Sequence, residues 1–208
     1  MIRALRRTTG RTGQFLGDAL AWRSPERQYA LVAWSLIAGA GLLIACVAGD
    51  PAWPGRILAA LYLVTLLAAV CAIDARYGII PDSLVCGLGA GGLLQTLLTD
   101  GGELLQQAVE ALLFLIAAWL FRSIFRWVRG YDGLGLGDVK FATAGVLWIG
   151  IEGVPALLLV AVLSALASLL ILKAEGHALD GKQAISFGPH LAVGLWLAWI
   201  LGPLQPGF

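Results

Sequence analysis

Residues 153–172 read GVPALLLVAVLSALASLLIL and contain no charged side chain. As an α-helix, 20 residues rise about 30 Å, which is the thickness of the hydrocarbon core of a bilayer. The bilayer core holds no water to bond free backbone groups, so a run of this kind must be helical there. This stretch predicts a membrane-spanning helix.

The composition of the whole chain agrees with a membrane location. Of the 208 residues, 59% are apolar and 13% are charged, and the mean hydropathy is +0.85. Soluble domains are about 45–50% apolar and about 25% charged, so an ordinary soluble enzyme is excluded. The net charge of +1 excludes a nucleic-acid-binding module. Cys46, Cys71 and Cys86 are isolated and form no CxxC pair, so they predict neither a zinc cluster nor a disulfide framework.

Six further apolar runs predict spans, which makes an all-α polytopic transmembrane helix bundle of about seven spans. The six runs are residues 28–49, 57–73, 83–99, 104–121, 141–151 (extending back to Leu136) and Pro189–Leu201. Gly87, Gly89, Gly91 and Gly92 gather in the third run, where small residues predict close packing of helices.

The basic residues predict the orientation of these spans. With the N-terminus in the cytoplasm, the inner segments hold every Lys and Arg except Arg56. The inner segments are 1–27, 74–82, 122–140 and 173–182. We therefore expect a basic cytoplasmic tail over residues 1–27 and one transmembrane domain over 28–208.

Two of these inner segments carry acidic residues in unusual settings. Residues 74–82 read DARYGIIPD, which places Asp74 at the end of one span and Asp82 before the next. Pro81 interrupts the helix between the two acids. Residues 130–140 read GYDGLGLGDVK, and Asp138 there begins the fifth span.

The glycines around Asp138 leave the backbone open. Gly135 and Gly137 add no side chains that would block access to it. Lys140 follows two residues later, where it would either balance the charge of Asp138 or extend to the membrane interface.

The predicted topology brings Asp74 and Asp138 to the same side of the membrane. Two carboxyls that share one proton suit acid–base hydrolysis, in which one activates water and the other polarises a carbonyl. The acids would otherwise cap helices or pair with Arg76, Lys140 or Arg129. Two other functions stay open: a proton- or cation-coupled transporter, and a lipid-phosphate enzyme with magnesium on these acids.

No metal or other cofactor is expected. His177 and His190 stand too far from other ligand-type residues in the sequence to predict a metal site.

Three segments of the chain resemble the type IV prepilin peptidases, which are membrane aspartyl proteases of the GxGD type. The segments are Ile73-Asp74 with Ile80-Pro81-Asp82, Gly135-Leu136-Gly137-Asp138-Val139-Lys140, and Ser186-Phe187-Gly188-Pro189. All three occur in order at the predicted inner face, and the resemblance covers about residues 28–204.

The resemblance implies that Asp74 and Asp138 are the catalytic pair, with Gly135, Gly137, Lys140, Pro81 and Asp82 in supporting positions. It also implies a reaction: cleavage after a glycine, between a basic leader and the hydrophobic helix of a prepilin or pseudopilin. The partners would be these substrate helices and the lipid bilayer of the bacterial inner membrane, with no nucleic acid.

Two differences from the long members of that family narrow the expectation. Long members carry a cytoplasmic insertion with paired CxxC motifs that is linked to methylation, and no CxxC occurs here. We therefore expect peptidase activity without methyltransferase activity, as in the short peptidases of tight-adherence pilus systems. Arg76 stands where long members often have an acid.

Overall fold

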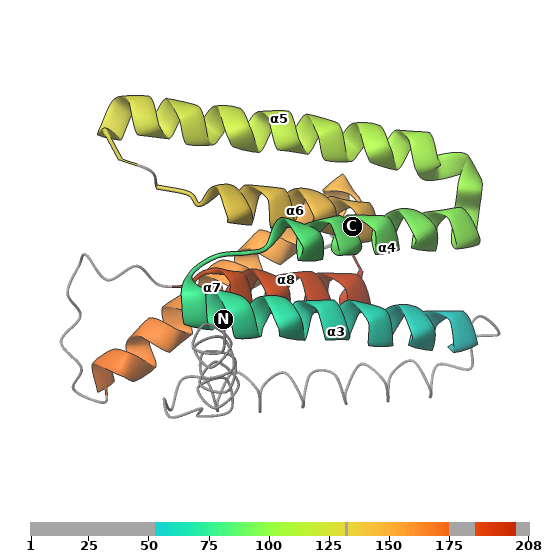
Figure 1. Cartoon of the computed structure of the whole chain (residues 1–208), viewed down its shortest axis with the longest axis horizontal. Helices are drawn as coiled ribbons and strands as arrows, with labels where there is room; N and C mark the ends of the chain where they lie inside the picture. The colour runs from blue at the N-terminus through green and yellow to red at the C-terminus, as the bar shows by residue number, and fades with distance from the viewer. Residues whose placement is uncertain (1–52, 132, 175–185, 203–208) are drawn as a thin grey trace, which may run out of the picture. The chain divides into compact units, whose positions relative to one another are not determined.

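The computed structural model describes residues 53–131, 133–174 and 186–202, which fold into helices without any β-strand in those ranges. Figure 1 shows the six α-helices. They are α3 (Trp53–Tyr77), α4 (Asp82–Asp100), α5 (Leu104–Arg129), α6 (Leu136–Ile149), α7 (Val154–Ala174) and α8 (Gly188–Leu201). Two short 3-10 helices, η1 (Gly101–Glu103) and η2 (Ile151–Gly153), precede α5 and α7. The predicted tail 1–27, the run 28–49, Asp132 and His177 lie outside the described residues.

The all-helical prediction is confirmed for the described ranges, where each of the six remaining apolar runs forms one α-helix. Three helical stretches are long and apolar enough to cross a membrane: Gly55–Tyr77, Leu104–Arg129 and Ile151–Leu170. Gly188–Leu201 is a shorter apolar helix. The protein is therefore a helical membrane protein, while the number of seven spans and their orientation stay predictions.

Helix α5 continues beyond the expected end of its apolar run at residue 121. Arg122, Arg126 and Arg129 favour helix and can extend their charged ends toward water, so the helix need not stop at the edge of the apolar region. It ends where Gly130 adopts a left-handed conformation (φ 77°) and donates its amide to the Arg126 carbonyl at 2.9 Å.

The turn between α3 and α4 fixes the positions of two acidic residues. Gly78 has a φ of 65° and donates its amide to the Asp74 carbonyl at 2.8 Å, which ends α3. Pro81 immediately precedes α4, and its carbonyl accepts the amide of Leu84 at 3.1 Å. Asp74 consequently lies in the last turn of α3, and Asp82 is the first residue of α4.

Helices α4 and α6 pack closely because glycines of α4 face α6. A Cβ on Gly92 would lie 2.6 Å from the Leu147 carbonyl oxygen, and one on Gly91 would collide with the rings of Tyr62 and Trp148. The predicted packing role is confirmed for these two glycines.

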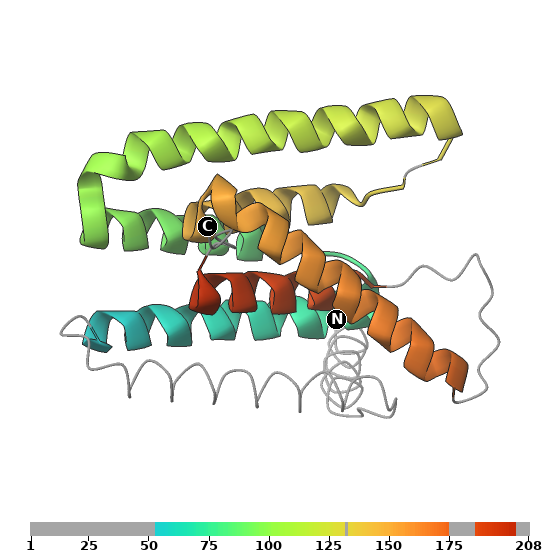
Figure 2. The same ribbon diagram turned by 180° about the vertical axis from the view of Figure 1, so that it is seen from behind.

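Helix α8 is central to the described residues, where it packs on α3, α6 and α7. Leu195 and Trp196 of α8 are completely buried, whereas most large apolar side chains of α5 are exposed. Figure 2 shows α5 running alongside α6 and α7 crossing the other helices at a steep angle. An exposed apolar surface on α5 is the surface expected of a helix that faces lipid.

Candidate active site

Asp74 is almost completely buried, with 5% of its surface exposed. Its Oδ2 atom accepts two hydrogen bonds, one from the Gly188 amide at 2.8 Å and one from the Ser186 hydroxyl at 2.5 Å. Both donors come from the segment that leads into α8, more than a hundred residues later in the chain. The carboxylate of α3 is therefore anchored at the beginning of α8.

The start of α8 has a physical need for this carboxylate. The first amides of a helix have no partner within the helix, and the helix dipole places partial positive charge there. The N-cap residue of α8, Phe187, supplies no side-chain cap. Asp74 meets the need from another helix, and Gly188 permits it, because a Cβ there would lie only 2.6 Å from Asp74 Oδ2.

The two carboxylate oxygens of Asp74 have different surroundings. Both hydrogen bonds end on Oδ2, and none from the described part of the chain ends on Oδ1. The anchoring of Oδ2 therefore leaves Oδ1 as the oxygen that can bond water or a substrate.

Asp138 lies in the first turn of α6 and is partly buried. The backbone amide of Gly135, the N-cap residue of α6, hydrogen-bonds to its carboxylate. This is the arrangement by which an acid three residues into a helix satisfies the N-cap amide. A Cβ on Gly135 would lie 2.8 Å from Asp138 Oδ2, so glycine is required for this approach.

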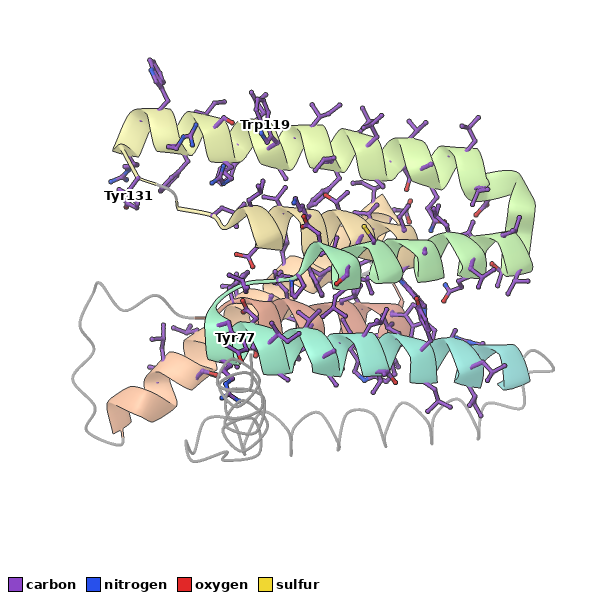
Figure 3. All side chains as sticks on the ribbon, in the orientation of Figure 1. Tyr77, Trp119 and Tyr131 are labelled. Atoms are coloured by element: carbon purple, nitrogen blue, oxygen red, sulfur yellow. The ribbon has the colours of Figure 1, made fainter. Side chains whose placement is uncertain are left out.

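The two acidic segments contact each other. A Cβ on Gly137 would lie 3.3 Å from the Cβ of Ile80, so the turn before α4 packs directly on the first turn of α6. Asp74 is near enough for its negative charge to act on the Asp138 carboxyl. In Figure 3, Tyr77 and Tyr131 mark the same end of the helices, which is the end where α6 begins. The fold thus gathers both acids at one end.

Lys140 does not balance the charge of Asp138. Its Nζ atom instead lies 2.8 Å from Asp82 Oδ1, in an ion pair that joins the start of α4 to the first turn of α6. The expectation of an ion pair between Lys140 and Asp138 is therefore wrong. Asp82, one turn beyond the Gly78 bend and 72% exposed in its side chain, is the acid within reach. Exposed pairs of this type contribute about 0–1 kcal/mol.

His190 is a neighbour of the acids that the sequence analysis considered only as a metal ligand. Its Nδ1 atom lies 2.8 Å from the Ser164 hydroxyl of α7, and its charge state is affected by Asp74. Within the described ranges, no group of three or more His, Cys, Asp or Glu residues is placed to hold a metal ion.

Sequence reasoning gave no role to Ser186 or Gly188, although it identified their motif. The signal was a Gly-Pro pair that opens an apolar run on the predicted inner side, as Asp138 opens another. That pattern predicts a helix start, but the identity of its partner depends on a contact between distant segments.

The fold and these contacts define a class: helical membrane proteins with two acidic side chains together at one end of the helices. The sequence model of the type IV leader peptidase family matches residues 61–172, which include both acids. This chain belongs to the type IV leader peptidase family.

Three relatives carry the name prepilin leader peptidase/N-methyltransferase. The protein of Dickeya chrysanthemi is 34% identical over 188 residues, which cover 90% of this chain and 63% of the relative. That of Pectobacterium carotovorum subsp. carotovorum is 33% identical, over 80% of this chain and 58% of the relative. That of Burkholderia pseudomallei (strain 1026b) is 33% identical, over 67% and 45%.

The chain thus spans less than two thirds of the length of these relatives. No solved structure matches it.

Proposed function

We propose that this protein is an aspartic endopeptidase that removes the leader peptide of type IV prepilins or pseudopilins. Asp74 and Asp138 are its catalytic residues in this proposal. The observation that carries it is the anchoring of a buried carboxylate, Asp74, by the start of α8 within electrostatic reach of Asp138. The names of the relatives support the choice of substrate.

The proposed reaction needs no nucleophilic side chain. The ionised carboxylate of the pair removes a proton from water, and the oxygen of that water attacks the scissile carbonyl carbon. The protonated partner donates its proton to the carbonyl oxygen. When the tetrahedral intermediate breaks down, the C–N bond breaks and the amine leaves with a proton from the pair.

The supporting residues act through the backbone in this proposal. Gly135 and Gly137 let the Asp138 turn approach its neighbours, and Pro81 sets the start of α4. Lys140 and Asp82 hold the starts of α4 and α6 together through their ion pair.

The proposed topology has seven spans, a cytoplasmic tail over residues 1–27 and a catalytic membrane domain over 28–208, in the bacterial inner membrane. The distribution of basic residues supports this orientation. Both acids would then lie at the cytoplasmic face, where the basic leader of a prepilin stays and its apolar helix enters the bilayer.

We propose peptidase activity alone. The relatives' names include an N-methyltransferase, but those proteins are longer, and the 208 residues here contain no CxxC pair. The comparisons give no support to the transporter alternative.

The direct test is the processing of a co-expressed prepilin from the same organism, followed by the change in its electrophoretic mobility. Asp74→Asn and Asp138→Asn should each abolish processing while the variants still insert into the membrane at normal levels. Processing by the unaltered protein should persist in a chelator. Processing that stops in the chelator and returns with magnesium would instead identify a metal-dependent enzyme.

A further inference from the structure

A cavity of about 360 Å³ lies among α5, α6, α7 and α8. Apolar side chains from all four helices line it, among them Ala118 of α5, Ala142 of α6, Leu158 of α7 and Leu191 of α8. Asp138 is the one charged residue in its lining. The cavity therefore combines an apolar interior with a single carboxyl group.

The packing of the helices explains the space. In the described residues, α5 packs along α6, and α7 packs on α8, but α5 has no comparable packing with α7 or α8. Where α5 and α6 face the gap, Ala118 and Ala142 present methyl groups rather than large side chains. The volume is consequently left between α5 and the α7–α8 pair.

The lining also includes residues from the segments that hold both acids. Leu134 precedes Gly135, and its carbonyl accepts a hydrogen bond from Arg122 Nε at 2.8 Å, which ties this loop to α5. Phe187 stands between Ser186 and Gly188, the two residues that bond Asp74 Oδ2. Since Leu134, Asp138 and Phe187 all line the cavity, it adjoins the site of both carboxyls.

We propose that this cavity receives the apolar side chain that follows the cleaved bond in the substrate. The inference rests on the proposed function and adds the element that selects the substrate. An apolar lining favours an apolar group, because a polar one would lose its bonds to water and find no partner there. The volume admits one large side chain, such as that of phenylalanine, and places the adjoining peptide carbonyl beside Asp138.

Neighbouring alanines of α5 provide a matched pair of variants. Ala118 lines the cavity, whereas Ala117 is exposed on α5 and is not part of the lining. Ala118→Phe would fill the space, and Ala117→Phe would add the same ring to the outer surface. Each variant is compared on two forms of one prepilin from the same organism, with phenylalanine or alanine after the scissile glycine.

Ala118→Phe should lower kcat/KM for the phenylalanine substrate by roughly ten- to a hundredfold more than for the alanine substrate, the range expected when a pocket excludes a large group. Ala117→Phe should treat both substrates as the unaltered protein does. Equal losses on both substrates, or no loss on either, would overturn the proposal.

A second measurement identifies the occupant directly. A photoreactive amino acid at position 118 in the Asp138→Asn variant should cross-link to the apolar part of the uncleaved prepilin. Cross-links to lipid alone, or to the basic leader, would overturn the proposal.

The proposed function can fail separately from this inference. If Asp138→Asn still cleaves while Ala118→Phe discriminates between the two substrates, the catalytic assignment is wrong and the cavity assignment stands.

Discussion

The backbone amide of Gly188 lies 2.8 Å from Asp74 Oδ2, although the two residues are 114 positions apart in the sequence. This bond joins the last turn of α3 to the first turn of α8 and fixes one oxygen of a buried carboxylate. It explains why a glycine stands at the start of α8: a side chain would occupy the place of the carboxylate.

Gly188→Ala is expected to eliminate prepilin processing. Its Cβ would lie 2.6 Å from Oδ2 and 2.8 Å from the carboxyl carbon of Asp74, so that carboxylate or the start of α8 must move. Processing in isolated membranes measures the effect. Gly87→Ala is the control, because its Cβ would meet only ordinary contacts at 3.7 Å. A Gly188→Ala protein with normal processing would show that Asp74 need not be held in this position.

Ser186→Ala removes the other donor to Asp74 and should slow cleavage by about ten- to a hundredfold. A hydrogen bond to a charged group is worth about 1.5–3 kcal/mol, and each 1.4 kcal/mol is a factor of ten. Initial rates of cleavage in detergent measure the loss. Ser123→Ala is the matched control, because the Ser123 hydroxyl bonds only a carbonyl of its own helix, at Trp119. Equal rates for the two variants would contradict the role given to Ser186.

Disruption of the Lys140–Asp82 pair should have a small effect. Lys140→Met and Asp82→Asn should each lower the free energy of unfolding by about 1 kcal/mol or less, because the pair is exposed to solvent. The exchanged pair, Asp82→Lys with Lys140→Asp, should recover most of that loss. Thermal unfolding in detergent, with cleavage measured in parallel, tests both statements. If Lys140→Met stopped cleavage as completely as Asp138→Asn, Lys140 would belong to the reaction itself.

Gly92→Ala should destabilise the fold by about 1–3 kcal/mol, the usual cost of adding a methyl group to a filled interior. Its Cβ would lie 2.6 Å from the Leu147 carbonyl oxygen, which is backbone and cannot rotate away. The free energy of unfolding in detergent measures this cost. Gly89→Ala serves as the control on the same helix, because its nearest neighbour would be a flexible side chain at 3.5 Å. Equal stabilities would contradict the close approach of α4 and α6.

The helices could be predicted because hydropathy acts locally. A charge-free run such as 153–172 has no alternative to helix in a bilayer, and α7 occupies Val154–Ala174. The end of α5 was less predictable, since the expected boundary at residue 121 rested on charge. Arginine is a good helix former, and the glycine at position 130 is what ends the helix.

The candidate site was predictable only in part. The settings of Asp74 and Asp138 are visible in the sequence because each lies beside a helix break. The partners of Asp74 and of Lys140 depend on which helix ends meet in space, and neither spacing nor composition contains that information. The cavity beside Asp138 depends on an absence of packing between α5 and the α7–α8 pair, which no sequence pattern records.

The most direct test of the account is the cleavage rate of Asp74→Asn, Asp138→Asn and the double variant on one prepilin, with folding monitored for each. Because residues that act as a unit are not additive, each single substitution should reduce the rate to background, and the double variant should be no slower. A single variant that keeps a measurable rate, with losses that multiply in the double variant, would show that the two carboxyls do not form one catalytic unit.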